Sequence, residues 1–273
     1  MPSIPIALTI AGSDSGGGAG IQADLKTFQR FGVYGTSAIT AVTAQNTQGV
    51  RAVQPVTAEV VAAQLDALAE DLPPDAVKSG MLATAELVSV VAAAIGRHTW
   101  RPYVLDPVMV ASSGDRLLDR DAEGAIRERL LPLAALVTPN LYEAAILTGL
   151  EVRDPDAMLR AGRRLIELGA AAALVKGGHL DGEDITDVLV TASGAQRFEH
   201  RRVATTSTHG TGCTLSAAIT AGLARRADGQ RGSGAVNDSD LGRIVAEALE
   251  FLQRAIATAP GIGKGHGPVN HQA

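Results

Sequence analysis

Short apolar runs alternate with longer helical patterns along this 273-residue chain. The runs that predict strands are Ile4–Ala11, Thr36–Thr43, Ala76–Ser79, Tyr103–Asp106, Ala135–Thr138 and Ala172–Lys176. Most of them are continuously apolar, as in strands that are covered on both faces. The alternation predicts a doubly wound α/β fold, with a mostly parallel central sheet and helices on both faces.

Two later runs, 187–191 and 196–203, have no helical pattern between them, so we expect an antiparallel pair at one edge of the sheet. Helix starts are indicated at Thr57, at Asp154-Pro155 and near Ser239. The stretch 225–238, rich in Gly, Ser, Asp and Arg, predicts an exposed loop. Because no internal repeat or linker is visible, we expect residues 1–273 to form a single domain.

Composition excludes several classes of protein. The formal net charge is −5 and no cluster of five or more Lys and Arg residues occurs, which argues against a nucleic-acid partner. The short apolar stretch near the start has no basic region before it, so we expect neither a signal peptide nor a membrane span. Cys213 is the only cysteine, which rules out an intrachain disulfide and favours a reducing compartment, the cytoplasm.

The strongest chemical signal is the segment Thr208–Thr214, which precedes an apolar helical run. Gly210 and Gly212 allow a tight turn whose N–H groups converge at a helix N-terminus, where a phosphate or an oxyanion is stabilised. Cys213 falls in the first helical turn, where the pKa of a thiol is commonly lowered. The alternative is an ordinary glycine turn with a buried cysteine.

Two carboxylates follow neighbouring predicted strands. Asp106 ends one strand and Glu143 comes shortly after the next, and such a pair can hold Mg²⁺ through its water shell. A helix cap at Asp106 and a solvated helix face at Glu143 are the alternatives. Lys176 ends a later strand and precedes two glycines, so its ammonium group is expected at the same edge. His179 follows it and is equally well explained as a surface residue.

Two further segments suit a small, flat ligand. The glycine-rich stretch Ala11–Gly20 allows a close approach of backbone, but Ile21 stands where a dinucleotide fingerprint needs its third glycine. No phosphate-binding P-loop pattern occurs either. The stretch Thr43–Gly49 offers amide side chains, and Gln45 can match the donor–acceptor edge of a heterocycle. As an alternative, Asn46 and Thr47 simply end the strand.

These segments, in this order, resemble the ribokinase superfamily and, more narrowly, the bacterial hydroxymethylpyrimidine/phosphomethylpyrimidine kinases. The resemblance extends over nearly the whole chain. It rests on AGSDSGGGAGIQADLKT, TAQNT, KSGM, LDPVM, TPNLYEA, VKGGH, THGTGCT and the tail GKGHGPVNH.

The resemblance implies an ATP- and Mg²⁺-dependent phosphorylation of 4-amino-5-hydroxymethyl-2-methylpyrimidine and then of its monophosphate, in thiamine biosynthesis. It also implies a homodimer. The positions that it implies are Gln45, Asp24, Met81 and Gly12 for the substrate, Lys176, Thr208 and Thr211 for the nucleotide, Asp106 and Glu143 for the metal, and Cys213, Gly210 and Gly212 for catalysis.

Cys213 stands where related sugar kinases carry an aspartate base, so the resemblance implies that its thiolate accepts the hydroxymethyl proton. The second transfer starts from a phosphate oxyanion and needs little or no base. Sugar kinases of the superfamily often carry a β-sheet lid soon after the first strand. Here the first strand leads directly into the glycine-rich stretch, so we expect no such lid and propose Ala111–Leu118 as a flap instead.

Two alternatives stay open. Pyridoxal or pyridoxine kinase activity, alone or as a dual specificity, uses the same logic of a flat heterocycle with a hydroxymethyl group. A silent module that only binds the pyrimidine is the alternative from another class. The presence of every expected catalytic group, with no DNA-binding motif attached, argues against the silent module.

Overall fold

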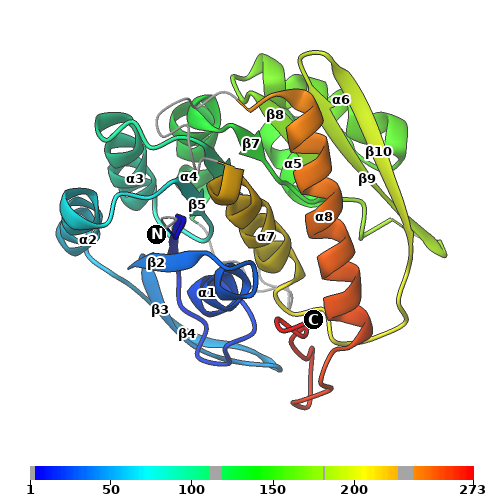
Figure 1. Ribbon diagram of the computed structural model, residues 1–273, viewed down its shortest axis with the longest axis horizontal. Helices are drawn as coiled ribbons and strands as arrows, with labels where there is room; N and C mark the ends of the chain where they lie inside the picture. The colour runs from blue at the N-terminus through cyan, green and yellow to red at the C-terminus, as the bar shows by residue number, and fades with distance from the viewer. Residues whose placement is uncertain (1–3, 111–118, 181, 227–235) are drawn as a thin grey trace.

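An eight-stranded sheet runs through the molecule, and Figure 1 shows helices packed on both of its faces. The computed structural model describes residues 4–110, 119–180, 182–226 and 236–273. The strands, in spatial order, are β10 (Gly194–Arg201), β9 (Asp184–Thr191), β8 (Ala172–Val175), β7 (Leu136–Val137), β6 (Tyr103–Leu105), β5 (Ala76–Ser79), β1 (Ile6–Ala11) and β2 (Tyr34–Ile39). The six strands from β8 to β2 are parallel, whereas β9 and β10 are antiparallel. The predicted doubly wound fold and its antiparallel edge are therefore confirmed.

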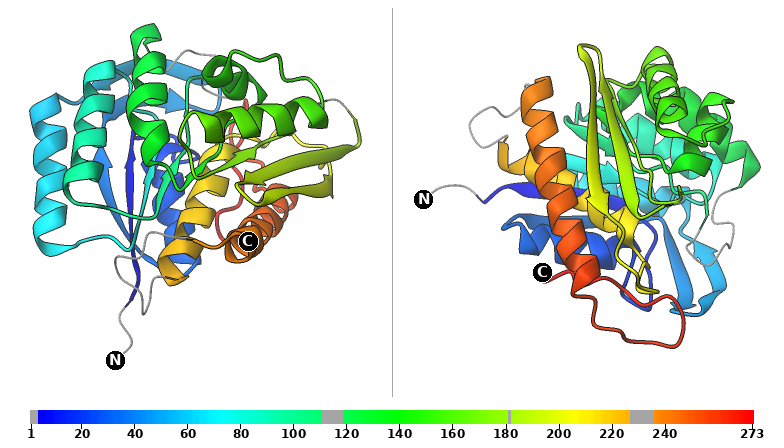
Figure 2. Two further views of the ribbon diagram at one scale, coloured as in Figure 1. Left: turned by 90° about the horizontal axis from the view of Figure 1, so that it is seen from above. Right: turned by 90° about the vertical axis from the view of Figure 1, so that its right-hand side faces the viewer.

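The helices form two layers, one on each face of the sheet (Figure 2). One layer contains α1 (Gly20–Arg30), α7 (Thr211–Arg226) and α8 (Asp238–Ala257). The other contains α2 (Ala58–Asp71), α3 (Ala85–Arg97), α4 (Arg120–Ala125), α5 (Leu141–Thr148) and α6 (Pro155–Glu167). Two short turns, Ile126–Leu130 and Leu131–Leu133, follow α4.

Two hydrophobic cores lie on either side of the sheet because successive side chains of a strand point to opposite faces. In β1, Ala7 packs with α1, α7 and α8, while Leu8 packs with α2 and α3. In β5, Ala76 packs in the same core as Ala7, and Val77 packs in the same core as Leu8. All four side chains are fully buried. This double burial explains why the strand sequences are apolar without alternation.

The predicted strand Thr36–Thr43 is wrong as a single element, because the chain leaves the main sheet at Thr40. β2 ends at Ile39, and β3 (Ala41–Asn46) pairs with β4 (Gly49–Pro55) in a separate two-stranded antiparallel sheet. Thr40 is buried and its hydroxyl donates to the carbonyl of Met81 at 2.6 Å, while its own carbonyl accepts from Val56 N–H at 2.9 Å. A β hairpin therefore stands beside the sheet after β2. Directly after β1 the chain passes into the glycine-rich stretch and α1, as expected.

The predicted helix starts agree with the structure within two residues. Thr57 precedes α2, and Asp154 caps α6 by accepting from Ala157 N–H at 2.7 Å. α8 begins at Asp238, with Asn237 as its cap. The predicted loop 225–238 overlaps the end of α7, which runs to Arg226, and its central part lies outside the described residues, as does the proposed flap 111–118.

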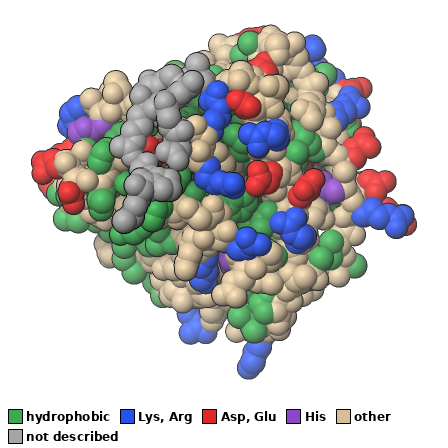
Figure 3. All heavy atoms as spheres, viewed as in Figure 1, with side chains coloured by type: hydrophobic (Ala, Val, Ile, Leu, Met, Phe, Trp, Pro, Cys, Tyr) green, Lys and Arg blue, Asp and Glu red, His purple; other side chains and the backbone are tan. Residues whose placement is uncertain are grey.

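Charges on the face crossed by α8 are interspersed, and Figure 3 shows no large patch of one sign there. Ion pairs join α7 to α8, from Arg225 to Glu247 and from Arg226 to Asp240. Among the described residues, no helix combines the length and apolar character that crossing a membrane requires.

Candidate active site

A cavity of about 520 Å³ opens at the carboxyl ends of the parallel strands. Its wall includes the residue that ends or directly follows four strands, namely Ala11, Gly80, Asp106 and Lys176, and also Asn140, three residues after β7. Doubly wound sheets bind ligands at this edge, because the loops after the strands converge there. The fold thus gathers segments that are far apart in the sequence.

Nearly all residues singled out from the sequence line this one cavity. They are Gly12, Gln45, Met81, Asp106, Glu143, Lys176, Thr208, Gly210, Thr211, Gly212 and Cys213. Asp24 is the exception, because its side chain is fully buried and does not line the cavity.

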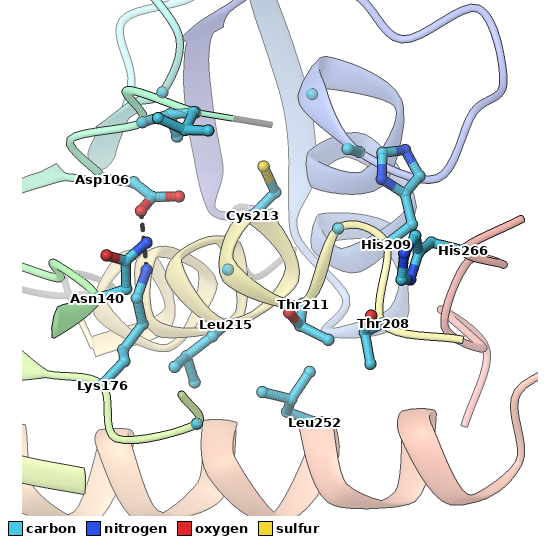
Figure 4. A pocket seen from close by; sticks show the side chains of 18 of the residues that line it. Asp106, Asn140, Lys176, Thr208, His209, Thr211, Cys213, Leu215, Leu252 and His266 are labelled. Atoms are coloured by element: carbon cyan, nitrogen blue, oxygen red, sulfur yellow. Dashed lines mark hydrogen bonds and ion pairs between the residues drawn. The ribbon is translucent and has the colours of Figure 1, made fainter. Parts of the chain in front are cut away.

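The segment Thr208–Thr214, here called the anion turn, leads into α7 at Thr211. Gly210 has a φ of +80°, and a Cβ there would lie 1.8 Å from the carbonyl oxygen of Gly18. Only glycine fits both conditions, so the turn and the glycine-rich loop are packed backbone against backbone. Figure 4 shows the turn at the centre of the cavity, with Thr208 and Thr211 on one side and the Cys213 sulfur pointing into the open space.

Cys213 does not have the lowered pKa that its place in the first turn predicted. Burial raises the pKa of its thiol to about 11, and the carboxylates of Asp24 and Asp106 add to the rise. The ammonium of Lys78 opposes this effect without overcoming it. The free protein therefore holds the protonated thiol near neutral pH, because loss of solvent outweighs the helix terminus here.

Asp106 and Lys176 form an ion pair in the cavity wall (Figure 4). Lys176 Nζ lies 3.2 Å from Asp106 Oδ1, and the Ser216 hydroxyl donates to Asp106 Oδ2 at 2.9 Å. Burial alone would raise the pKa of Asp106, but the ammonium groups of Lys176 and Lys78 and the bond from Ser216 lower it. The same ammonium of Lys176 lies against the anion turn, since a Cβ on Gly212 would be 3.2 Å from it.

Glu143 stands at the start of α5 and is buried. It forms a capping box with Asn140, in which Glu143 Oε2 accepts from Asn140 N–H at 2.8 Å and Asn140 Oδ1 accepts from Glu143 N–H at 2.9 Å. Burial raises the pKa of Glu143 to about 7, against the attraction of Lys176 and with the help of the Asp106 charge. The solvated helix face considered for this residue is therefore wrong.

Asp14 organises the glycine-rich loop between β1 and α1. Its carboxylate accepts from the N–H groups of Gly16, Gly18 and Ala19 at 2.8 to 3.0 Å and contacts His209 Nε2 at 2.8 Å. Burial would raise the pKa of Asp14, but the contact with His209 and these N–H donors lower it. This carboxylate thereby ties the loop to the anion turn, 195 residues away in sequence.

Asp24 forms a buried ion pair under the cavity. Lys78 Nζ lies 2.6 Å from Asp24 Oδ1, and the Thr9 hydroxyl donates to Asp24 Oδ2 at 2.6 Å. Burial lowers the pKa of Lys78, but the Asp24 carboxylate outweighs it and the pKa stays above its ordinary value. A Cβ on Gly80, in the cavity wall, would be 3.6 Å from this ammonium. The expected contact of Asp24 with substrate is therefore replaced by a supporting role beneath the wall.

The cavity has two chemically different ends. At the glycine-loop end, the walls are the backbone of Gly12, the thioether of Met81 and the amide of Gln45. Gly12 N–H donates to Met81 O at 3.2 Å, and a Cβ on Gly12 would be 3.1 Å from the Met81 sulfur. Ser15 and Gln45 exchange two bonds, from Ser15 Oγ to Gln45 O at 2.6 Å and from Gln45 N–H to Ser15 Oγ at 2.8 Å.

At the other end, here called the α8 end, the lining combines an apolar wall with polar residues that include Asp187, His200 and Gln253. Leu215 and Leu252 face this part of the cavity in Figure 4, and Ile185, Val203 and Ile256 extend the apolar wall. Arg202 donates to the carbonyls of Gly178 and Gly182 at 2.9 Å and also to that of Leu180. Burial, together with the charges of Lys176 and Arg202, lowers the pKa of His179, which lines the cavity beside them.

Four polar residues of this site were not singled out as site residues from the sequence: Asp14, Lys78, His209 and Ser216. Asp14 and His209 lie inside the two glycine-rich motifs. Their positions could have identified them, but the interpretation of those motifs considered mainly the glycines. Ser216 and Lys78 lie within an apolar helix and an apolar strand. A charged or hydroxyl side chain inside such a run needs a buried partner, and that requirement was the available signal.

Comparisons with known proteins agree on one family. The family model described as phosphomethylpyrimidine kinase matches residues 14–270. The hydroxymethylpyrimidine/phosphomethylpyrimidine kinase of Rhizobium meliloti is 51% identical over 269 residues, which are 97% of this chain and 96% of that protein. A thiamine biosynthesis bifunctional protein of Geobacter sulfurreducens is 48% identical over 97% of this chain, which spans 51% of that longer relative.

The solved structures agree with this result. A crystal structure of the Bacillus subtilis pyridoxal kinase in complex with ADP has a TM-score of 0.87 and 38% identity, over 99% of this chain and 98% of that one. The ribokinase-like fold of this chain is therefore shared with a pyridoxal kinase. The motifs, the cavity and the matches lead to the same conclusion: the chain belongs to the phosphomethylpyrimidine kinase family.

Proposed function

We propose that this chain phosphorylates 4-amino-5-hydroxymethyl-2-methylpyrimidine with ATP and then phosphorylates the resulting monophosphate, in thiamine biosynthesis. The observation that carries the proposal is a single cavity in which Gln45 and the anion turn face a common space around Cys213. The chain belongs to the phosphomethylpyrimidine kinase family. A relative named hydroxymethylpyrimidine/phosphomethylpyrimidine kinase matches it over nearly the whole length of both proteins.

The pyrimidine binds at the glycine-loop end. Its edge presents donors and acceptors in one plane, and the amide of Gln45 offers both. The strand that carries Gln45 is fixed by its two bonds with Ser15, so the amide starts from a rigid backbone. Met81 covers one face of the ring, and the bare backbone of Gly12 allows it to approach closely.

The nucleotide binds at the α8 end, with its base against Leu215 and Leu252. Its phosphates extend toward the anion turn, where Thr208 and Thr211 offer hydroxyls and the first turn of α7 presents the positive end of the helix. The ammonium of Lys176 lies against Gly212 and adds a positive charge at this point. The relative from Bacillus subtilis, solved with ADP, supports a nucleotide site in this fold.

Transfer of the phosphoryl group depends chiefly on the fixed charges and N–H groups around it, which stabilise the charge that develops on its oxygens. Cys213 lies in the open space beside them and accepts the hydroxymethyl proton in the first transfer. Because the pKa of the thiol is about 11, only a small fraction is thiolate near neutral pH. Its contribution is therefore smaller than that of the anion turn, and it is absent from the second transfer.

The residues present fit a hydrated Mg²⁺ ion. Asp106 and Glu143 line the cavity with carboxylates that already accept bonds from Lys176, Ser216 and Asn140. In the described part of the chain, no group of three or more acidic, histidine or cysteine side chains surrounds a point. This arrangement suits an ion that keeps most of its hydration shell, and Asp106 and Glu143 would hold it there. When bound, Mg²⁺ neutralises charge on the phosphates.

The test is a product assay with purified protein, ATP and Mg²⁺. We expect mass spectrometry to detect the pyrimidine monophosphate first and the diphosphate later, with one ADP formed per phosphoryl group. Addition of excess EDTA should stop both transfers. ATP consumption without a diphosphate product would contradict the proposal, and so would full activity in EDTA.

Pyridoxal kinase activity is the second candidate, because the structural match to the Bacillus subtilis pyridoxal kinase is close. The same Gln45, Met81 and Gly12 walls can take another flat ring. We expect pyridoxal to be used with a kcat/KM about tenfold or more below that of the pyrimidine, since one site discriminates between such rings by only a few groups. A competition assay with both substrates measures this ratio directly.

We also propose that the enzyme is a cytoplasmic homodimer. The family resemblance supports this assembly, and the use of ATP supports this location. Sedimentation of the purified protein tests the first proposal, and fractionation of the cells that produce it tests the second.

A further inference from the structure

The segment 261–268, which follows α8, forms a strap between two parts of the cavity wall. Figure 1 and Figure 2 show it leaving the end of α8 and returning to the side of the molecule that carries the β3–β4 hairpin. We call this segment the C-terminal strap. Its sequence belongs to the tail motif GKGHGPVNH, to which the proposed reaction gives no role.

One end of the strap is attached to the turn of the hairpin. The hydroxyl oxygen of Thr47 accepts from Lys264 N–H at 3.1 Å and from Gly265 N–H at 3.3 Å. A Cβ on Gly265 would lie 2.1 Å from the Thr47 carbonyl oxygen, so only glycine allows this approach. Thr47 is two residues from Gln45, and the strap is therefore connected to the strand that holds the pyrimidine.

The other end of the strap is attached to the anion turn. His209 N–H donates to Gly267 O at 3.0 Å, and His209 pairs with Pro268 as in a parallel bridge. Pro268 also packs against the glycine-rich loop, because a Cβ on Gly18 would be 2.9 Å from it. Both ends are thus fixed to elements of the cavity wall, the hairpin and the anion turn, and the residue between the two attachments is His266.

His266 lines the cavity, and Figure 4 shows it beside Thr208 and His209, on the side away from Lys176. Within the described chain, its ring has no hydrogen bond or ion pair. The neighbouring His209 is engaged by Asp14, and Lys176 is engaged by Asp106. An imidazole offers an N–H in either protonation state, so His266 is a donor without a partner at the mouth of the glycine-loop end.

The two successive substrates differ in one respect that such a donor can detect. The monophosphate carries a phosphate where the first substrate carries a hydroxyl, and its binding requires donors on the substrate side of the anion turn. We propose that the C-terminal strap is the part of the active site that distinguishes the two substrates, with His266 donating to the phosphate of the monophosphate. This inference rests on the proposed two-step function.

The first experiment compares the two steps in His266→Ala. We expect the KM for the pyrimidine monophosphate to rise about tenfold, since a charge-assisted hydrogen bond is lost. The KM for the unphosphorylated pyrimidine should change less than about twofold, because this substrate carries no phosphate. The KM for ATP should stay within the same limit, and a larger rise would place His266 with the nucleotide phosphates beside Thr208 and overturn the inference. His266→Gln, which retains an N–H at similar reach, should recover part of the loss.

The second experiment tests whether the strap positions His266. Thr47→Val removes the acceptor for Lys264 and Gly265, and we expect the same selective rise in the KM for the monophosphate. Because both changes act on one contact, the double variant should be little worse than either single variant. Thr258→Val is the matched control, because Thr258 accepts from Asn270 elsewhere in the C-terminal region, away from the cavity.

Equal changes in both steps, or none in either, would overturn the inference while leaving the proposed function intact. Additive effects of Thr47→Val and His266→Ala would overturn the positioning role of the strap. A wild-type protein that forms no diphosphate would instead overturn the proposed function, so the two failures are distinguishable. Thermal unfolding of each variant shows whether a loss of activity comes from a loss of folding.

Discussion

The two ends of the cavity are built in different ways. The glycine-loop end is assembled from segments distant in sequence, and its polar groups hold one another: Asp14 alone joins three N–H groups and His209. The α8 end adds an apolar wall, formed by side chains such as Leu215 and Leu252. The polar glycine-loop end suits a small ring that is recognised by directional hydrogen bonds. The apolar wall of the α8 end suits a larger base that is held by the apolar surface it buries. Substitutions at the glycine-loop end should therefore affect the kinetic constants for the pyrimidine, and those at the α8 end should affect the constants for ATP.

The largest effect is expected where both ends meet, at Gly210. In Gly210→Ala, the φ of +80° and a contact of 1.8 Å with Gly18 O force the anion turn to move. We expect kcat for both transfers to fall by about 10³, which is the cost of losing preorganised N–H donors. Steady-state kinetics of each step measure it.

Gly149→Ala is the matched control for this prediction. Gly149 has a φ of +73°, but a Cβ there would meet nothing within 4 Å. It should lower the free energy of unfolding by about 1 kcal/mol and leave kcat unchanged. If the two variants behaved alike, the contact between the anion turn and the glycine-rich loop would have no catalytic meaning.

Lys176→Met should give the next largest effect and should affect the nucleotide. Loss of the ammonium that faces Asp106 and Gly212 is expected to lower kcat/KM for ATP about 100-fold, since phosphate charge is left uncompensated. The KM for the pyrimidine should change little. Lys26→Met, which removes an exposed lysine near the glycine-rich loop, should alter neither constant. A rise in the pyrimidine KM alone would contradict the division into two ends.

Gln45→Ala tests the glycine-loop end. We expect kcat/KM for the pyrimidine to fall about 30-fold, because the amide that pairs with the ring edge is lost, while the KM for ATP stays constant. Gln54→Ala changes an exposed glutamine on the paired strand of the same hairpin and serves as the control. Isothermal titration with the unphosphorylated pyrimidine provides an independent readout. If Gln45→Ala bound the unphosphorylated pyrimidine with unchanged affinity, the hairpin would have no part in substrate recognition.

Cys213→Ala should give the smallest effect and should separate the two transfers. The first transfer is expected to lose about tenfold in kcat, less than the 10²- to 10⁴-fold typical of general acid–base catalysis because little of the thiol is ionised, and the second less than about twofold. Because the pKa of the free thiol is about 11, its thiolate fraction grows tenfold per pH unit below that value. Wild-type kcat/KM for the first transfer should therefore rise from pH 7 to pH 9, and Cys213→Ala should lose this rise. Equal losses in both transfers would contradict a base role.

The sequence predicts the sheet well and the hairpin poorly, for a physical reason. Strands covered on both faces must be apolar, so β1, β5 and β8 are visible as continuous runs. The break at Thr40 depends on its bonds with Met81 and Val56, which are tertiary contacts. The local sequence pattern carries no information on such contacts. The single predicted strand 36–43 is therefore divided between β2 and β3 in the structure.

The site shows the same division between local and tertiary information. Gly210, Gln45 and Lys176 belong to motifs whose residue types indicate their role, and all three line the cavity. The role of Asp24 could not be predicted, because its partner Lys78 is 54 residues away on another strand. The raised pKa of Cys213 was also missed, since a helix terminus is visible in the sequence and the loss of solvent is not.

The C-terminal strap has a consequence for the order in which the protein becomes active during its synthesis. Thr47 and its partner Lys264 are 217 residues apart, and His209 joins the glycine-rich loop to the C-terminal strap, which is synthesised much later. Contacts this distant form late, because the intervening chain must first be ordered. A ribosome-bound chain that lacks the strap would present an unfinished substrate end. Phosphorylation of the monophosphate would thus begin only after the last segment of the cavity has left the ribosome.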